Sequence, residues 1–532
     1  MKKTIINIII TLLIAAIVYY LTLPAINLNN IGFYIYISFI ILVFTFLESI
    51  NKNKIDLIIN GNQKKINAPK IFIYGFGFII VIFSVILLAN FICSPLFNAK
   101  SYQKRITINE NGDWNKDIPE VNFNQLPLLD KDSSKVLGDR VMGQMNELVS
   151  QFSVSQMYTQ INYNDSIIRV TPLEYADAIK WLTNRKNGIS GYITVNSVTG
   201  EANLVRLNKG MKYSPSALFN ENLHRKLRFS YPTLNFGHVS FEIDNEGNPY
   251  YIVPIIKYTA IGLKARVSGV IIFDPITGDS QKYNNGEIPK WVDIAYSADL
   301  IIEQVDDWGT YKNGFWNSIF GQKNVVNTTD GYNYLAMNDD IYLYTGITSV
   351  VSDESNLGFI LTNMRTGATT YYSVPGAEEY SAMNSAEGQV QDMGYKSTFP
   401  LLINLNSNPT YLVSLKDSNG LVKMYAFIDV KDYQKVTVTD SSKGIIVAKD
   451  NYLASNKKEI KDEELLIKEI KISSINSANI DGYTYYYIIS ENKKYKISIV
   501  LSDKLPFLKN GDILKVGYYE TTDEVIKVEK VY

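Results

Sequence analysis

The stretch Ile5-Ile-Asn-Ile-Ile-Ile-Thr-Leu-Leu-Ile-Ala-Ala-Ile-Val-Tyr-Tyr-Leu-Thr-Leu23 contains no charged side chain. A helix needs about 20 apolar residues to cross the ~30 Å hydrocarbon core of a bilayer, so this stretch predicts a transmembrane helix. Two further runs, roughly 31–49 and 71–93, are nearly uncharged over a similar length. Tyrosines near the ends of the runs are typical of a membrane–water interface. We therefore expect three transmembrane helices within residues 1–93.

The lysines that flank these runs predict their orientation. Lys2 and Lys3 precede the first run, five more lysines lie between residues 50 and 70, and Pro24–Asn30 has no charge. Because lysine-rich loops stay in the cytoplasm, the N-terminus is expected inside and the chain after Cys93 outside. The first run could instead be a cleaved signal peptide, although Leu23-Pro24-Ala25 is a poor cleavage site. The large region would lie outside in either case.

Length, charge and cysteine content limit the class of protein. A chain of 532 residues should fold as several domains. Its 52 basic and 53 acidic residues give no overall field that would attract nucleic acid. Cys93 is the single cysteine, so no disulfide forms within the chain, and a long cysteine-free exported region is typical of a Gram-positive envelope. Asn90-Phe91-Ile92 lacks the small residues of a lipidation motif, so a buried or interfacial thiol is expected.

One sequence pattern occurs twice in the outer region. Gly191-Tyr-Ile-Thr-Val-Asn-Ser-Val-Thr-Gly200 aligns without gaps with Gly358-Phe-Ile-Leu-Thr-Asn-Met-Arg-Thr-Gly367. Further matches keep the same order: Asp165–Thr171 with Asp339–Thr345, Tyr231-Pro232 with Phe399-Pro400, Asn248–Tyr251 with Asn408–Tyr411, and Phe273-Asp274 with Ile428-Asp429. The ordered set predicts a duplicated unit, with copies at about 153–283 and 328–436.

Each copy is expected to combine strands, tight turns and a helix. Glycine-ending dipeptides such as Thr199-Gly200 lie between apolar runs, where a turn needs positive φ. In the first copy Thr171, Pro172 and Glu174 predict a capped helix. Seven residues are missing at that place in the second copy, so the helix is expected to be absent there. The pattern therefore predicts α+β units with antiparallel sheets.

Segments outside the copies complete the predicted organisation. The polar segment before the first copy contains three prolines and no sustained period, which predicts a stalk, and an apolar stripe predicts a helix over Ser133–Phe152. Near the C-terminus, alternating apolar residues and the turns Asp481-Gly482 and Asn510-Gly511 predict a five-stranded, OB-like β-barrel after a charged linker (456–464). The predicted regions are three transmembrane helices (1–93), stalk (94–132), first α+β unit (133–283), connector helix (284–327), second α+β unit (328–440) and small β-barrel (460–532).

The connector is rich in tryptophan. Ile294, Ala298, Ile301, Val305 and Trp308 form a helical stripe, flanked by Trp291 and Trp316. An apolar face packed between the two copies explains this pattern. A partner-binding aromatic surface formed by Trp291, Trp308 and Trp316 is the alternative.

The strand that ends in Phe273-Asp-Pro-Ile-Thr-Gly278 gives the chain a resemblance to PepSY-type modules. In that family a helix packs on a small antiparallel sheet, and a strand commonly ends in Asp-x-x-Thr-Gly. The hairpins ending at Gly200 and Gly367 have Asn196 and Asn363 where the acid would be. The resemblance covers about half of the outer region. It implies non-catalytic extracytoplasmic modules that bind or restrain envelope proteins such as peptidases.

The residues available for catalysis or metal binding are few. His224 and His238 are the only histidines, and no Gly-x-Ser-x-Gly or phosphate-binding loop is present. His224 lies in a basic helical run and His238 on the polar face of a strand, so both are expected to be solvated. Asp244–Gly247 and Asp417–Gly420 resemble turns more than calcium loops. No cofactor, metal site or catalytic residue is therefore predicted.

Three readings of function remain open. A membrane-anchored binding, scaffolding or regulatory protein of the bacterial envelope, with membrane lipid and envelope proteins as partners, fits the duplicated unit and the scarcity of catalytic residue types. A wall hydrolase or transferase could use Asp306-Asp307 or Glu378-Glu379, because paired carboxylates cleave glycosidic bonds. The three spans could also pair with other helices in a membrane complex, with Gly75 and Gly77 allowing close approach.

Overall fold

The computed structural model describes residues 2–52, 70–350, 352–456, 465–480, 483–519 and 524–532. The chain divides into two compact units, Met1–Val436 and Thr437–Tyr532. Most of the predicted lysine-rich loop, the charged linker and the Asp481-Gly482 turn lie outside the described residues.

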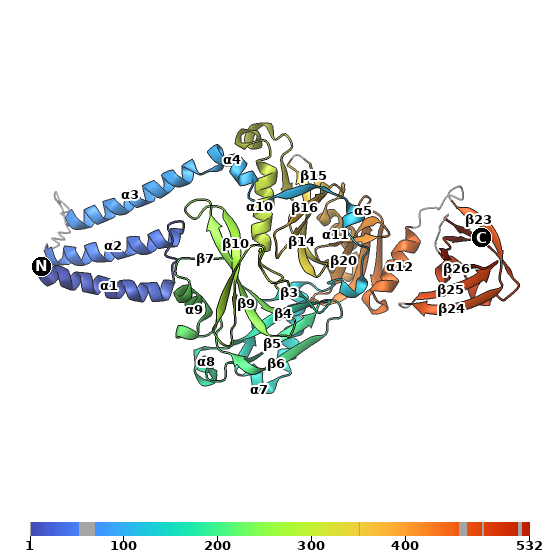
Figure 1. The fold of residues 1–532 in the computed structure, drawn as a ribbon, viewed down its shortest axis with the longest axis horizontal. Helices are drawn as coiled ribbons and strands as arrows, with labels where there is room; N and C mark the ends of the chain where they lie inside the picture. The colour runs from blue at the N-terminus through green and yellow to red at the C-terminus, as the bar shows by residue number, and fades with distance from the viewer. Residues whose placement is uncertain (1, 53–69, 351, 457–464, 481–482, 520–523) are drawn as a thin grey trace. The chain divides into compact units, whose positions relative to one another are not determined.

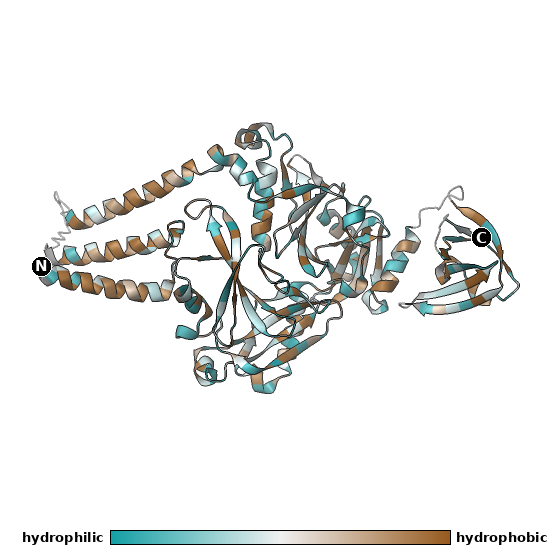
Figure 2. Cartoon of the chain, viewed as in Figure 1, coloured by the Kyte–Doolittle hydropathy of each residue, from teal (hydrophilic) through white to brown (hydrophobic). Residues whose placement is uncertain are grey.

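Three N-terminal helices are long and apolar enough to span a membrane: α1 (Lys2–Thr22), α2 (Ile31–Lys52) and α3 (Lys70–Ile92). Figure 2 shows hydrophobic residues along nearly their whole length. Polar contacts join α1 to α2, because Asn7 Nδ2 donates to Glu48 Oε1 at 2.9 Å and Tyr36 Oη donates to the Ala15 carbonyl at 3.0 Å. Such interhelical bonds stabilise helix pairs in lipid.

The helix ends contact the region that follows them. In the α1–α2 loop, the Ile26 N–H donates to the Pro232 carbonyl at 2.8 Å. Near the end of α3, Asn90 Nδ2 donates to the Ile261 carbonyl at 3.0 Å. The α1–α2 loop and the end of α3 therefore lie on the same side of the three helices as residues 232–261 (Figure 1).

Beyond α3, the described part of the first unit folds into four sheets and a set of short helices (Figure 1). The helices are α4 (Pro95–Gln103), α5 (Trp114–Asp117), α6 (Lys131–Gly143), α7 (Asn146–Val149), α8 (Ala178–Asn184), α9 (Leu223–Ser230), α10 (Ala298–Thr310) and α11 (Glu379–Gly388). The strands are β1 (Ile108–Gly112), β2 (Phe152–Val154), β3 (Thr159–Tyr163), β4 (Ser166–Tyr175), β5 (Ile189–Asn196), β6 (Ala202–Met211), β7 (Asn235–Phe236), β8 (Ser240–Ile243), β9 (Pro249–Tyr258), β10 (Ala265–Phe273), β11 (Ser280–Asn284), β12 (Val326–Thr328), β13 (Asn333–Met337), β14 (Asp340–Ser349), β15 (Ser352–Asn363), β16 (Thr369–Tyr372), β17 (Gly376–Ala377), β18 (Lys396–Ser397), β19 (Leu401–Leu405), β20 (Asn408–Lys416) and β21 (Val422–Asp429).

The strands pair in the same order twice along the chain. β2 and β3 both pair with β4, which continues to β5 and β6; β12 and β13 both pair with β14, which continues to β15 and β16. Likewise β7 and β8 pair with β9, which continues to β10, and β18 and β19 pair with β20, which continues to β21. One difference is α8, which lies between β4 and β5, whereas β14 ends at Ser349 and β15 begins at Ser352.

The turns that carry Gly200 and Gly367 have the same hydrogen bonds. Asn196 Oδ1 accepts the N–H groups of residues 198 and 199, and the Gly200 N–H donates to the Asn196 carbonyl. Asn363 repeats all three bonds with residues 365, 366 and Gly367. Asp274 makes the same set with Ile276, Thr277 and Gly278. Asparagine therefore makes the same hydrogen bonds as aspartate in this turn, because the turn needs only a side-chain oxygen acceptor.

Replacing these two glycines by alanine should separate backbone strain from crowding. Gly200 and Gly367 have φ of 77° and 74°, a region that costs an alanine about 1 kcal/mol. A Cβ on Gly200 would meet nothing closer than 3.5 Å, whereas one on Gly367 would lie 2.7 Å from the Tyr296 ring. We expect Gly200→Ala to cost about 1 kcal/mol and Gly367→Ala about 2–3 kcal/mol in urea unfolding. Equal costs would contradict the crowding at Tyr296.

Several sequence predictions for this unit are wrong. Residues 94–132 are not a separate stalk: β1 pairs in parallel with β16, Trp114 is buried against Tyr372, and the Leu129 N–H donates to the Ser197 carbonyl. The buried apolar side chains of this segment are irregularly spaced along the chain, so the sequence shows no helical or strand period there. The helix predicted over Ser133–Phe152 is instead α6 and α7, which end before β2.

Two further local predictions are also corrected. Thr171, Pro172 and Glu174 lie inside β4, because pairing with β2 and β5 overrides the local capping pattern, and the helix begins later with Asp177 as its cap. Tyr231-Pro232 follows α9 directly, but Phe399-Pro400 follows β18 and not α11. The two dipeptides therefore do not both mark the change from a helix to a strand.

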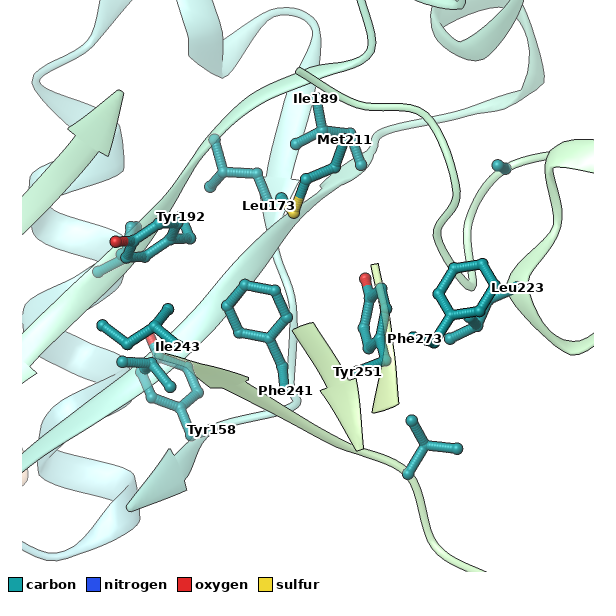
Figure 3. Packing of buried hydrophobic residues seen from close by; sticks show 14 of the residues in the cluster. Tyr158, Leu173, Ile189, Tyr192, Met211, Leu223, Phe241, Ile243, Tyr251 and Phe273 are labelled. Atoms are coloured by element: carbon teal, nitrogen blue, oxygen red, sulfur yellow. The ribbon is translucent and has the colours of Figure 1, made fainter. Parts of the chain in front are cut away.

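One large cluster of buried side chains packs between the sheets that β2 to β6 and β7 to β11 form. Figure 3 shows Phe241, Tyr251 and Phe273 packed with Leu173 and Tyr192. A second cluster forms where α10 meets β14 and β15, and it includes Ile301, Val305 and Trp308. The stripe predicted for the connector helix is therefore buried.

The second unit is small and rich in β-strands. After β22 (Val436–Asp440) and α12 (Ile445–Ser455), its described residues form two sheets around one apolar core. The first sheet has the order β23 (Leu466–Lys471), β27 (Ile513–Tyr518), β29 (Lys530–Val531), and the second has the order β24 (Ser474–Ile480), β25 (Tyr483–Ser490), β26 (Lys493–Ser498), β28 (Val525–Lys527). The predicted five strands are therefore too few, since the described residues contain seven.

Candidate functional site

The repeated pairing order defines two sets of sheets, the first formed by β2 to β11 and the second by β12 to β21 with β1. A cavity of about 850 Å³ lies where these two sets meet. Corresponding positions of the two sets line it. In the β3–β4 hairpin Gln160 pairs with Arg169, and in the β13–β14 hairpin Tyr334 pairs with Leu343. Gln160 and Tyr334 therefore occupy corresponding positions, and both line the cavity. A smaller cavity of about 350 Å³ shares Ser297 with the larger one. The size is typical of a ligand pocket.

The two hairpins pack on each other next to this cavity. Ile167 of β4 and Ile341 of β14 occupy corresponding positions, and both belong to the cluster of buried residues around α10. Asn162 Nδ2 also donates to Asp339 Oδ1 at 3.1 Å. Side chains alternate along a strand, so Arg169 lies on the same face of β4 as Ile167. That face is the one turned toward the second set of sheets.

Arg169 is the most unusual residue in the cavity. It is only 5% exposed, and no hydrogen-bond or ion-pair partner is present for it among the described residues. Across β3, Gln160 is 3% exposed, and neither its amide nitrogen nor its amide oxygen has a partner. More than 90% of buried polar groups in proteins are hydrogen-bonded, and a buried charge without a partner is destabilising. These two side chains are therefore not explained by the fold alone.

The surroundings of Arg169 favour an anion. Lys131 lines the same cavity, and its pKa is lowered by burial, by Lys135 and by Arg169. Asp130 is engaged elsewhere, because it forms an ion pair with Lys416 and accepts the Ser133 N–H at the start of α6. Burial lowers the pKa of Arg169 and raises the pKa of Tyr334. A guanidinium, an ammonium and an unpaired amide thus line one cavity.

The three tryptophans proposed as a partner surface do not lie together. Trp308 is 6% exposed in the cluster around α10, which leaves it unable to contact a partner. Trp291 packs against Tyr250 with ring centroids 5.0 Å apart. Trp316 is 62% exposed. It directly precedes the short helix Asn317–Gly321 and stacks on Phe320 of that helix. Of the three, only Trp316 is well exposed.

The paired carboxylates proposed for hydrolysis have structural contacts. Asp306 accepts both the N–H and the hydroxyl of Thr328, and Asp307 forms an ion pair with Arg105. Glu379 is fully buried and accepts Asn356 Nδ2 at 3.1 Å, and burial raises its pKa. Asp306, Asp307 and Glu379 therefore have contacts that stabilise the fold.

The histidines lie apart and carry no visible catalytic partner. His224 is exposed on α9, and His238 is exposed at the edge of the cavity before β8. Within the described residues, no three His, Cys, Asp or Glu side chains are grouped closely enough to hold a metal ion. Cys93 is half-buried after α3, where its carbonyl accepts the Tyr102 hydroxyl at 2.9 Å.

The polar side chains of β8, Ser240 and Glu242, are buried. Glu242 is 0% exposed and accepts the backbone N–H groups of Asp293 and Ile294 at 2.8 and 3.0 Å, and the Ser240 hydroxyl at 3.0 Å. Burial raises the pKa of Glu242 to about 7. Burial and the nearby Glu242 also raise the pKa of Asp293. These carboxyl groups hold the segment before α10 against β8.

Comparison with known proteins gives no relative. No protein-family model matches the chain, and no curated protein matches it. Among solved structures, the α-L-arabinofuranosidase from Lactobacillus brevis aligns with 9% identity over 70% of this chain and 94% of that chain. The TM-score of 0.16 is too low to carry an argument about fold or activity.

Proposed function

We propose that this chain is a membrane-anchored, extracytoplasmic ligand-binding protein of the bacterial envelope, with the cavity between the two sets of sheets as its binding site and no catalytic role. The observation that carries the proposal is the pair of buried, partnerless side chains, Arg169 and Gln160, in a cavity of about 850 Å³. Polar groups that lack partners in the protein are available to a ligand.

The repeated pairing order supports this proposal, and the repeated unit is proposed to be PepSY-like. The repeated order and the shared turn at Gly200 and Gly367 are what two copies of one unit would have. A helix of 13 residues precedes each copy, α6 before the first and the connector helix α10 before the second. A binding site between two copies is common, since clefts between similar units provide converging side chains. The C-terminal unit is proposed to be a small OB-like recognition domain.

The orientation is part of the proposal. The contacts of Ile26 and Asn90 with residues 232 and 261 support a short outer loop on the same side as the sheets. The lysines before α1 and after α2 support the opposite side as cytoplasmic. A reporter fused after Thr310 should be active only outside the membrane, and one fused after Lys54 only inside. The reverse pattern would exclude an extracytoplasmic binding site.

Binding in the cavity can be tested without knowing the ligand. Full-length protein extracted from its own membranes is expected to retain a noncovalent small-molecule adduct in native mass spectrometry. Ser297 lines both cavities, and its side chain makes no cap bond at the start of α10. Ser297→Trp should fill the cavity and remove the adduct. Ser153→Trp, on an exposed strand position, serves as the matched control and should keep the adduct.

The proposal fails if wild-type protein carries no adduct, or if the Ser297→Trp variant carries the same adduct as the Ser153→Trp variant. Thermal unfolding of both variants shows whether the fold is kept. A folded Ser297→Trp protein with an unchanged adduct would place the ligand elsewhere.

A further inference from the structure

We propose that Arg169 binds an oxyanion of the ligand, a carboxylate or a phosphate, with Gln160 as a second donor. This inference rests on the proposed function and names the chemical class of the ligand. It starts from the position of Arg169 on β4, where the side chain is 5% exposed and lacks a partner among the described residues.

Guanidinium chemistry favours this class of ligand. The planar fork of an arginine donates two parallel hydrogen bonds to a carboxylate or a phosphate, and these charge-assisted bonds are stronger than neutral ones. Gln160 is the cross-strand neighbour of Arg169, and its unpaired amide nitrogen offers one more donor. A neutral ligand group would leave Arg169 with only the charges of Asp130 and Asp132, which make no hydrogen bond to it, as compensation in the protein interior.

The charged side chains around the cavity leave Arg169 without an ion pair. Arg169 and Lys131 are the basic side chains of the lining, and Asp130, Glu174 and Asp299 are its acids. Asp130 forms an ion pair with Lys416, and Glu174 accepts the Ser155 hydroxyl at 2.6 Å. The charges of Asp130 and Asp132 partly oppose the effect of burial on the pKa of Arg169, but neither carboxylate hydrogen-bonds to it.

The remainder of the lining predicts an apolar or aromatic body next to the anion. Tyr332, Tyr334 and Phe399 come from the second set of sheets, and Met157 and Val239 from the first. Tyr332 and Tyr334 contact each other edge to face, with ring centroids 5.6 Å apart. Aromatic walls of this kind bind the apolar part of a ligand while polar groups fix its orientation.

The test uses the full-length chain in detergent and three probes of similar shape: phenylacetate, phenyl phosphate and phenylacetamide. At least one of the two anions should raise the unfolding temperature and bind in calorimetry, and the neutral amide should bind about tenfold more weakly or not at all. The anion that binds better distinguishes a carboxylate ligand from a phosphate ligand. Equal binding of the amide, or binding of neither anion, would overturn the proposal.

Variants at Arg169 give a second readout. Arg169→Gln should lose about tenfold or more in anion affinity while its unfolding temperature without ligand rises, because a buried charge without a partner is removed. Arg140→Gln, at an exposed position on α6, is the matched control and should bind like the wild type. A purely structural role for Arg169 predicts the opposite, a lower unfolding temperature. Arg169→Gln with unchanged anion affinity would also refute the proposal.

The native adduct separates the two proposals. If wild-type protein carries an adduct and Arg169→Gln carries the same adduct in the same amount, the anion-binding role of Arg169 is wrong and the proposed function stands. If no wild-type adduct is found, the proposed function itself fails.

Discussion

Replacing Arg105 by methionine is expected to lower the free energy of unfolding by about 2–4 kcal/mol, because the buried carboxylate of Asp307 loses its guanidinium partner and keeps only Lys264 Nζ, 3.4 Å away. The Arg105 side chain is 0% exposed, and it forms ion pairs with Asp307 and Glu303 and donates to the Ala265 carbonyl at 2.7 Å. These bonds connect the segment after α4 to α10 and to β10. Urea unfolding of the full-length chain, followed by tryptophan fluorescence, measures the loss.

An exposed ion pair provides the control for Arg105. Arg206 pairs with Glu147, but the two side chains are 55% and 66% exposed. Exposed pairs contribute about 0–1 kcal/mol, so Arg206→Met should change little. The double substitution of Arg105→Met with Asp307→Leu should recover part of the stability, because the most buried carboxylate of the network is removed and Glu303 keeps Lys264 as its partner at 2.7 Å. A loss at Arg105 no larger than at Arg206 would contradict the structural role assigned to this buried pair.

Stability is expected to fall as pH rises from about 4.5 to 7, through the contribution of Glu242. An unfolded glutamate has a pKa of about 4.3, and burial raises the pKa of Glu242 to about 7. In that window the unfolded chain releases this proton while the folded chain keeps it, so the proton-bound fold loses stability with rising pH. Above the folded pKa both states are ionised and the contribution becomes constant.

Glu242→Gln should flatten this decline by about 3–4 kcal/mol, since glutamine cannot ionise. Its single carbonyl oxygen can accept only one of the N–H groups of Asp293 and Ile294, so the variant is also expected to be less stable than the protonated wild type at every pH. Unfolding free energies at pH 5, 6, 7 and 8 test this. Glu246→Gln, in the exposed turn before β9, should follow the wild-type curve. Parallel curves for all three proteins would show that Glu242 ionises in the fold as it does in water.

The sequence predicted the features that depend on local rules. The membrane helices follow from uninterrupted apolar runs, and the stripe of α10 follows from a 3.6-residue period. The turns at Gly200 and Gly367 follow from the need for positive φ and a side-chain acceptor. Each of these features is encoded within a few neighbouring residues, so it can be read without knowing the fold.

The features that were missed depend on contacts between distant segments. Arg169 lies in an ordinary strand sequence, and nothing nearby indicates that both faces of β4 are buried. The burial of Glu242 was not predicted, because strand alternation cannot distinguish solvent from a second layer of protein. The cavity arises only when β3 and β13 are brought together, which the chain order does not specify.

The parallel pairing of β1 with β16 has a consequence for the order of synthesis. Ile108 pairs with Thr369, so β1 is synthesised about 260 residues before its partner. During that interval its backbone donors and acceptors are an open edge, to which another nascent chain could attach. The sheet that contains β1 and β16 can close only after strands β2 to β11 have all been synthesised. A chain that stalls before Thr369 would therefore leave this edge uncovered.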